Sequence, residues 1–228
     1  MQLFITEYSK NDHIAITAPR VVHQVYKVLR MQSGDRFAVQ KESATERLVV
    51  QLDTITPTTI TASISQTIER PSLSDTTLII AYPNKFEKIE LIIQKLSEIG
   101  ISDIIFRDGE RSQLHTLSEH KIARCHTIAL EAVEQSHGRV LPRISQISHL
   151  SDAHIHPQEA VVCDHHDTID QTVLYKRSQC IVWPEGGLGP REYTYLQSIG
   201  VGSYSLGKHI LRTETAAIIA GRLTHSLG

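Results

Sequence analysis

The stretch Ile181-Val-Trp-Pro-Glu-Gly-Gly-Leu-Gly-Pro190 decides how this chain of 228 residues folds and where it binds. The apolar residues from Cys180 to Trp183 predict a short buried strand. The glycines that follow predict a turn, and Pro190 suits the first turn of a helix. In α/β folds, a strand that opens into a glycine-rich loop before a helix is a common ligand site, because glycine lets the backbone approach the ligand closely.

A second stretch, Leu206-Gly-Lys-His-Ile-Leu-Arg-Thr-Glu-Thr-Ala216, lies near the C-terminus. Its leucine and glycine are expected at the exit of a strand, and a helix is expected to begin with Thr213 as its N-cap. Glu214 in the first turn would offset the helix dipole, whereas Arg212 at the same end is electrostatically less natural. We therefore expect Arg212 to be placed for a binding partner.

The composition is that of an ordinary water-soluble globular protein, with 40% hydrophobic and 21% charged residues and a net charge of −2. No apolar run reaches the roughly 18–20 residues that span a membrane, and the first residues do not resemble a signal peptide. The three cysteines have no CxxC spacing, and their odd number argues against a disulfide framework. These features predict a protein of the reducing cytoplasm with no membrane partner.

Residues 1–70 predict a strand-rich domain with one helix. Alternating β-branched runs at short spacing are typical of a small β-barrel. The helix is expected over residues 19–31, with Val25, Val28 and Leu29 among its apolar positions. A polar, proline-containing segment at 68–75 is expected to be a linker.

Residues 71–228 alternate between apolar strands and amphipathic helices, which predicts an α/β domain. A helix is expected over 85–99, ended by Gly100, and another over 121–136, ended by Gly138. The charged back of the first helix, which includes Lys88, fits a solvated face. Residues 107–113 are expected to be a polar loop.

Two other sets of residues suit chemistry without being specific. Arg111-Ser112 could contact a phosphate or could be an ordinary surface turn. His154, His156, His165, His166 and Asp167 supply metal-type ligands, so a metal-dependent hydrolase is an alternative function. Against it, adjacent residues of a strand point to opposite faces, and no recognised metal-ligand spacing accompanies the histidines. We predict no metal site.

The glycine-rich stretch fits none of the common nucleotide or nucleophile motifs. It lacks the third glycine of a dinucleotide-binding loop and the lysine of a phosphate-binding loop. No GxSxG nucleophile elbow is present either. By itself the stretch indicates only a tight turn or a close approach to a ligand.

Several short motifs, in order along nearly the whole chain, carry a resemblance to a known family. They are His23 with Val28-Leu-Arg30 and Gly34-Asp35; Lys85, Glu90, Gln94-Lys95 and Glu98-Ile-Gly100; Arg111-Ser112; Glu131-Ala-x-Glu134-Gln-Ser136 with Arg139 and Pro142; Pro184-Glu-Gly-Gly187 with Glu192; and Leu206-Gly-x-x-Ile-Leu-Arg-x-Glu-Thr-Ala216. On these motifs the chain resembles the bacterial ribosomal small-subunit methyltransferase E family, the 16S rRNA (uracil-N3) methyltransferases of the SPOUT superfamily.

The resemblance implies an N-terminal PUA-like, RNA-binding β-barrel over 1–70 and a SPOUT α/β domain over 71–228 with a deep C-terminal trefoil knot. It implies a homodimer that binds S-adenosylmethionine in the knot and methylates N3 of a uridine in 16S rRNA of the small ribosomal subunit. One residue departs from the family, which usually has glycine where this chain has Trp183.

The resemblance also implies roles for individual residues. The expected cofactor-binding residues are Trp183, Pro184, Glu185, Gly186, Gly187, Leu206, Gly207, Ile210, Leu211 and Thr215. The expected RNA-binding residues are Arg20, His23, Lys27, Arg30, Lys85, Arg111, Ser112 and Arg139. Arg212 is the candidate for stabilising charge on uracil, and Glu214 for positioning the substrate or steering its proton. A non-catalytic RNA-binding protein of the same fold is a further alternative, because of Trp183.

Overall fold

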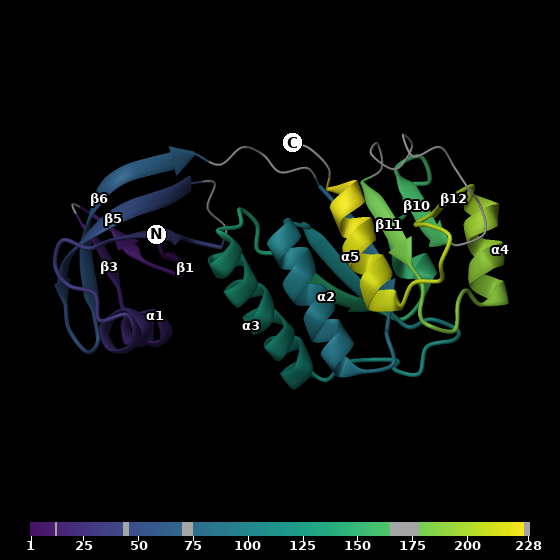
Figure 1. Cartoon of the computed structure of the whole chain (residues 1–228), viewed down its shortest axis with the longest axis horizontal. Coiled ribbons are helices and arrows are strands. Elements are labelled where there is room, and N and C mark those ends of the chain that lie inside the picture. Colours follow the sequence, from purple (N-terminus) through teal and green to yellow (C-terminus); the bar gives the residue numbers. More distant parts are fainter. Residues whose placement is uncertain (12, 43–45, 70–74, 165–177, 226–228) are drawn as a thin grey trace. The chain divides into compact units, whose positions relative to one another are not determined.

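The computed structural model describes the chain except for residues 12, 43–45, 70–74, 165–177 and 226–228. It divides into two compact units (Figure 1). The N-terminal unit comprises Met1–Ser72 with Glu134–Arg139, and the C-terminal unit comprises Leu73–Val133 with Val140–Gly228. The expected domain boundary at residue 70 stays a prediction, because it borders residues outside the described part of the chain.

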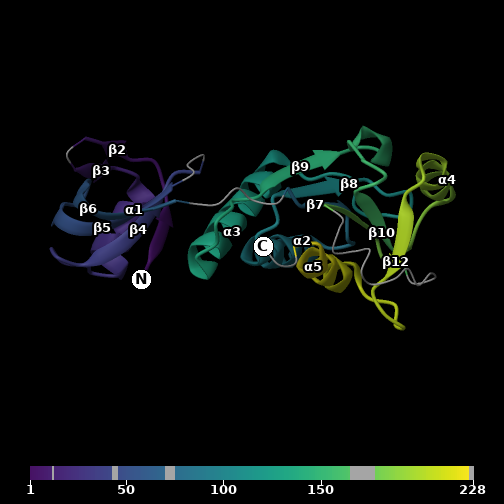
Figure 2. The same ribbon diagram turned by 90° about the horizontal axis from the view of Figure 1, so that it is seen from above.

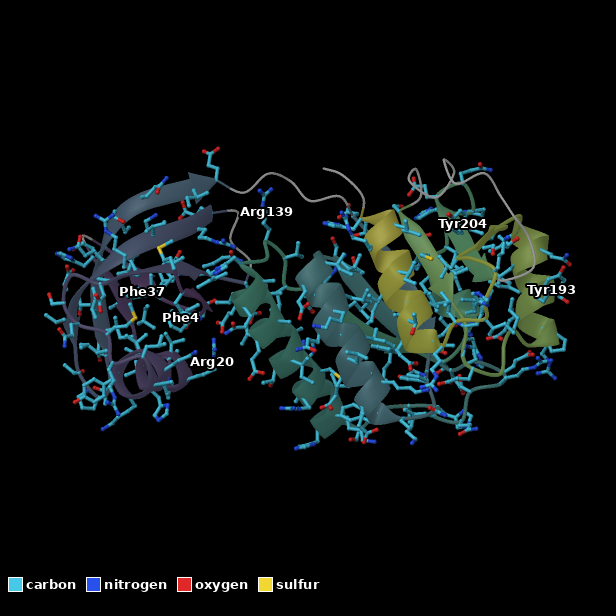
Figure 3. All side chains as sticks on the ribbon, in the orientation of Figure 1. Phe4, Arg20, Phe37, Arg139, Tyr193 and Tyr204 are labelled. Carbon is cyan, nitrogen blue, oxygen red and sulfur yellow. The ribbon has the colours of Figure 1, made fainter. Side chains whose placement is uncertain are left out.

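A curled six-stranded sheet builds the N-terminal unit, in the strand order β1-β4-β5-β6-β3-β2 (Figures 1 and 2). Its strands are β1 (Leu3–Ile5), β2 (Ser9–Lys10), β3 (Ile14–Ile16), β4 (Arg36–Gln40), β5 (Glu46–Ile55) and β6 (Ile60–Glu69). The pairs are antiparallel except for β1 with β4. Alternate side chains, such as Phe4 and Phe37, meet in one core, as the alternating sequence pattern predicts (Figure 3).

The helix expected over residues 19–31 changes geometry midway. It consists of α1 (Pro19–His23) and a π-helical turn, η1 (Gln24–Val28). A π-turn holds more residues per turn than an α-helix, so the side chains after it rotate away from the buried face. Val25 is fully buried, whereas Val28 is 61% and Leu29 41% exposed. The prediction that the latter two continue the apolar face was wrong for this reason.

A six-stranded parallel sheet forms the C-terminal unit, in the order β12-β10-β11-β7-β8-β9. Its strands are β7 (Thr77–Ala81), β8 (Asp103–Arg107), β9 (Arg143–Ile147), β10 (Ala160–Asp164), β11 (Gln179–Val182) and β12 (Gly202–Ser205). Its helices are α2 (Phe86–Ile99), α3 (Glu119–Ser136), the short η2 (Leu150–Asp152), α4 (Pro190–Ile199) and α5 (Thr213–Thr224). The strands are apolar runs because both faces of the sheet are covered.

Successive residues of each strand face opposite sides of this sheet and contribute to two cores. Leu78 and Ile80 pack on the face covered by α2, α3 and α5. Ile79 and Ile181 pack on the other face, against α4 and η2. Helices α2 and α5 lie side by side in both views (Figures 1 and 2). Because the strands are parallel, their carboxyl ends share one edge of the sheet.

Three helix ends test the expected capping residues. Gly100 follows α2 with φ of 97°, which confirms the predicted glycine cap. Helix α3 ends at Ser136, and His137 rather than Gly138 takes the left-handed conformation, with φ of 55°. At α5 the N-cap is Arg212, and the predicted cap Thr213 is already the first helical residue.

Two further predictions concern the cysteines and the membrane: no disulfide framework was expected, and no membrane-spanning segment. Cys125, Cys163 and Cys180 are buried, and none of them forms a disulfide bond. Burial raises the pKa of the Cys125 thiol to about 11, so this thiol stays protonated at neutral pH. Within the described ranges, every helix is too short or too polar to cross a membrane.

Candidate functional site

A cavity of about 450 Å³ opens near the carboxyl ends of β10, β11 and β12, where parallel sheets commonly bind ligands. Two loops form its walls: the glycine loop (183–189), which follows β11, and the C-terminal loop (206–212), which follows β12. The exposed Tyr193 of α4, labelled in Figure 3, also lines the cavity. The two distant glycine-containing stretches therefore line one cavity, and ligand binding there stays a prediction.

The glycine loop is fixed by a hydrogen bond within the loop and by close contact with Arg111. The Gly187 N–H donates to the Pro184 carbonyl at 2.9 Å and closes a tight turn. The Arg111 guanidinium donates to the Gly186 carbonyl at 3.0 Å. A Cβ on Gly186 would lie 2.8 Å from the Arg111 Cβ and 3.1 Å from the Arg111 carbonyl oxygen, so only glycine fits there.

A buried ion pair anchors the far end of the glycine loop. Glu192, 7% exposed, accepts a hydrogen bond from the Gly189 N–H at 2.9 Å and forms an ion pair with Arg107. Arg107 is completely buried. Burial lowers the pKa of this guanidinium, and the Glu192 carboxylate opposes that shift. The expectation that residue 107 begins a polar loop was wrong, because Arg107 is the buried last residue of β8.

Trp183 packs against the arginine of this buried ion pair. Its side chain is 9% exposed and packs in the core between the sheet and α4. The Arg107 guanidinium carbon lies 5.8 Å from the centre of the indole ring, a cation–π distance. Trp183 also borders the cavity. The indole therefore joins the inner wall of the cavity to the buried ion pair.

Among the described residues, the C-terminal loop makes fewer hydrogen bonds and ion pairs to its surroundings than the glycine loop. Gly207 has φ of 139°, and a Cβ there would meet no atom of the described residues within 4 Å. Its N–H donates to the Ser205 hydroxyl at 3.3 Å. Ile210 lines the cavity yet is 81% exposed. Thr213, which closes the loop, is 2% exposed, and its hydroxyl has no hydrogen-bond partner in the described part of the chain.

Lys88 joins the glycine loop to α5, and this role was not predicted from the sequence. Its ammonium group forms an ion pair with Glu185 of the glycine loop and lies 3.6 Å from Glu214 of α5. The hydrogen bond from Lys88 to Glu185 raises the pKa of the lysine, although its partial burial opposes this. The charged back of α2 is therefore not only a solvated face.

All the expected cofactor-binding residues line the cavity except Thr215, which is exposed on α5. Arg212 is exposed at the N-cap of α5, and Glu214 is half-buried in its first turn. The lining residues that were not anticipated for this role are Arg111, Cys163, Val182, Leu188, Tyr193, His209, Thr213 and Ala216. Ligand contacts by any of these residues stay predictions.

The expected RNA-binding residues of the N-terminal unit fall into two groups. Arg20 forms a two-fold ion pair with Glu134, at 2.9 and 2.7 Å, and donates to the Ile5 carbonyl at 3.0 Å. His23, Lys27 and Arg30 are exposed on α1 and the turn that follows it. Arg20, labelled in Figure 3, is therefore already bonded within the protein, whereas His23, Lys27 and Arg30 face solvent.

The remaining expected RNA-binding residues are also divided. Lys85 is exposed at the N-cap of α2, and Arg139 is exposed beyond α3 (Figure 3). Ser112 is 9% exposed, and its hydroxyl accepts a hydrogen bond from the Gly109 N–H at 3.2 Å. Ser112 therefore holds its own loop together.

The described residues give no structural support to the alternative of a metal-dependent hydrolase. His154 and His156 are exposed, and the single side chain of Gln179 fixes their backbone at 2.9 and 2.8 Å. His165, His166 and Asp167 lie outside the described residues. Among the residues that are described, no group of three or more potential ligands could hold a metal ion.

Comparison with known proteins agrees with this geometry. The chain is 26% identical to the "Ribosomal RNA small subunit methyltransferase E" of Rickettsia conorii, with 96% of this chain and 92% of the relative covered. It is 27% identical to the protein of the same name from Bacillus subtilis, with 96% and 94% covered.

Solved structures share the fold. The structure of a ribosomal RNA small subunit methyltransferase E from Neisseria gonorrhoeae, bound to S-adenosyl methionine, matches with a TM-score of 0.83 at 21% identity; 97% of this chain and 95% of that chain are covered. A probable rRNA-methyltransferase from Porphyromonas gingivalis matches with a TM-score of 0.80 at 23% identity, over 99% and 98%. The family model of an RNA methyltransferase domain matches residues 69–225, well over half of the chain, so the chain belongs to this RNA methyltransferase family.

Proposed function

We propose that this protein transfers the methyl group of S-adenosylmethionine to N3 of a uridine in the 16S rRNA of the small ribosomal subunit. The observation that carries the proposal is the cavity between the glycine loop and the C-terminal loop, in a chain of an RNA methyltransferase family. Relatives named for methylation of small-subunit rRNA cover nearly the whole chain and support the choice of substrate.

The residues around the cavity fit this cofactor. A volume of about 450 Å³ suits a ligand of its size. Buried polar atoms at the cavity residues, the Thr213 hydroxyl and the Trp183 indole N–H, have no partner within the described residues and could bond a ligand. When bound, the cofactor supplies a methyl group on a positively charged sulfur. The protein then needs to position the two reactants more than to activate them.

Arg212 and Glu214 are proposed to act on the uracil. N3 must lose its proton, and negative charge then spreads to O2 and O4 of the ring. Arg212 is an exposed cation at the N-terminus of α5, where the helix dipole also favours negative charge. Glu214 lies in the first turn of α5, 3.6 Å from the Lys88 ammonium group, and is proposed to orient the substrate or steer its proton.

The N-terminal unit is proposed to hold the RNA. N3 lies on the base-pairing edge, so the uridine must be unpaired or flipped to react. His23, Lys27 and Arg30 are exposed, and the sequence from residue 19 to residue 34 contains no acidic residue that would repel phosphates. We further propose a cytoplasmic homodimer with a C-terminal trefoil knot, as the resemblance to the family implies.

Methyl transfer to RNA tests the proposal. The protein is incubated with small subunits that lack N3 methylation and with S-adenosylmethionine carrying a labelled methyl group. Label should enter 16S rRNA, and reverse transcriptase should stop at one uridine, because an N3 methyl blocks pairing. Transfer to another atom or another RNA would contradict the proposed specificity, and binding of RNA without transfer would favour the non-catalytic alternative.

Arg212→Ala separates the role of this residue from cofactor binding. The variant should bind S-adenosylmethionine normally while its methyl transfer falls by about 100-fold or more, the usual cost of losing one group that stabilises developing charge. Arg222→Ala, which removes an exposed arginine from the last turn of the same helix, serves as the control. Unchanged transfer by Arg212→Ala would remove Arg212 from the mechanism.

A further inference from the structure

Lys88 occupies a position that no other described lysine shares. It lies in the first turn of α2, and its side chain is 19% exposed. Its ammonium group pairs with Glu185, which lines the cavity, and lies 3.6 Å from the Glu214 carboxylate in α5. The second distance is an electrostatic contact rather than a hydrogen bond. One cation thus stands between an acid of the glycine loop and an acid of α5, the helix that follows the C-terminal loop.

The two carboxylates depend on this cation. Glu185 is 31% and Glu214 12% exposed, so water screens them only in part. Without a positive charge between them they would repel each other, and the wall segments that carry them would tend to separate. Glu185 also places a negative charge at the edge of the cavity, and Lys88 neutralises it.

We propose that Lys88 is a positioning residue that ties the glycine loop to α5 and sets the charge of the cavity toward the ligand's sulfur. The proposal rests on the function proposed above and deepens it. The methyl donor carries a positive sulfur, whereas its product, S-adenosylhomocysteine, carries a neutral one. Because Lys88 neutralises Glu185, the cavity should bind S-adenosylmethionine and S-adenosylhomocysteine with similar affinity, apart from the contacts that the methyl group makes.

Two substitutions shift this balance in opposite directions. Lys88→Met removes the positive charge and leaves Glu185 unpaired, so affinity for donor relative to product should rise about fivefold while both ligands bind more weakly. Glu185→Gln removes the negative charge and leaves Lys88 in place, so the same ratio should fall by about as much. A role in folding alone would weaken both ligands equally.

Calorimetric titration of the full chain with S-adenosylmethionine and with S-adenosylhomocysteine tests the proposal. Lys88→Arg should restore the ratio of the unmodified protein. Lys95→Met is the matched control, because Lys95 lies on the same helix and pairs only locally, with Glu98 at 2.8 Å. It should leave both affinities unchanged.

The outcomes are distinct. Opposite shifts in Lys88→Met and Glu185→Gln support the proposal. Equal weakening of both ligands in these variants, or no change, overturns it while the proposed function stands. If Lys88→Met does not fold, the donor-to-product affinity ratio of Glu185→Gln still decides: a fall supports the proposal and no change overturns it. Failure of the unmodified protein to bind either ligand overturns the proposed function, and this inference with it.

Discussion

The two walls of the cavity are built in different ways. The glycine loop is fixed by Arg111, by the Glu192 cap and by Trp183 packed against the buried Arg107. In the C-terminal loop, by contrast, no described atom lies within 4 Å of the position of a Cβ on Gly207, and Ile210 is largely exposed. We infer that the glycine loop is a preformed wall for the cofactor, whereas the C-terminal loop adjusts when ligand or RNA binds.

The largest expected effect comes from breaking the anchor of the glycine loop. Glu192→Ala leaves the Arg107 charge buried without its partner and removes the cap from the Gly189 N–H. The free energy of unfolding should fall by about 3–5 kcal/mol. Urea denaturation measures it, with the exposed Glu131→Ala as the control. A loss below about 1 kcal/mol would show that the ion pair does not hold this wall.

Substituting one glycine in each wall compares the walls directly. Gly186→Ala must displace the backbone of Arg111, which should cost ~1–3 kcal/mol and weaken cofactor binding at least tenfold. Gly207→Ala meets no described atom within 4 Å and should cost the strain of its φ of 139°, about 1 kcal/mol. Chemical denaturation and calorimetry of the pair measure both effects. Equal effects on binding would contradict the contrast between a rigid and an adjustable wall.

Hydrogen exchange should show the same contrast in the unmodified protein. Peptides from 184–190 should exchange at least tenfold more slowly than those from 206–212, because the Gly187 and Gly189 amides are hydrogen-bonded. Adding S-adenosylmethionine should protect 206–212 more than 184–190. Mass spectrometry of both segments, with and without the ligand, gives the comparison. Equal protection of the two segments in the free protein would argue that both walls are preformed.

The smallest expected effect is the pH dependence of the ion pair between Lys88 and Glu185. The hydrogen bond to Glu185 raises the pKa of Lys88, so its contribution is fully present below the unfolded value of 10.5. The contribution is lost as the pH rises through the higher folded pKa. The urea midpoints of the unmodified protein and Lys88→Met should therefore differ at pH 8 and converge above pH 10.5. A difference that persists unchanged at high pH would assign the effect to packing.

The elements and the two loops could be predicted from sequence because they depend on local patterns. Apolar strands, the glycine cap of α2 and the proline at the start of α4 each have a signature a few residues long. The π-turn after α1 could not be predicted in this way. Its sequence keeps helical apolar spacing, yet it leaves Val28 exposed.

The missed residues of the site have long-range partners. Lys88 and Glu185 are 97 positions apart, and Arg107 and Glu192 are 85 apart. Locally, Lys88 looks like one of several charges on a helix back, and Arg107 looks like the start of a polar loop. Only the folded chain brings them to their partners. The same holds for Trp183, whose role depends on the guanidinium packed against it.

Calorimetric titration of the full, unmodified chain with S-adenosylmethionine tests the central claim most directly. The claim is that the two loops form one pocket for the methyl donor. We expect saturable binding of both the donor and S-adenosylhomocysteine, weakened at least tenfold in Gly186→Ala. Absence of binding by either ligand to the unmodified chain, with the protein folded, would contradict it.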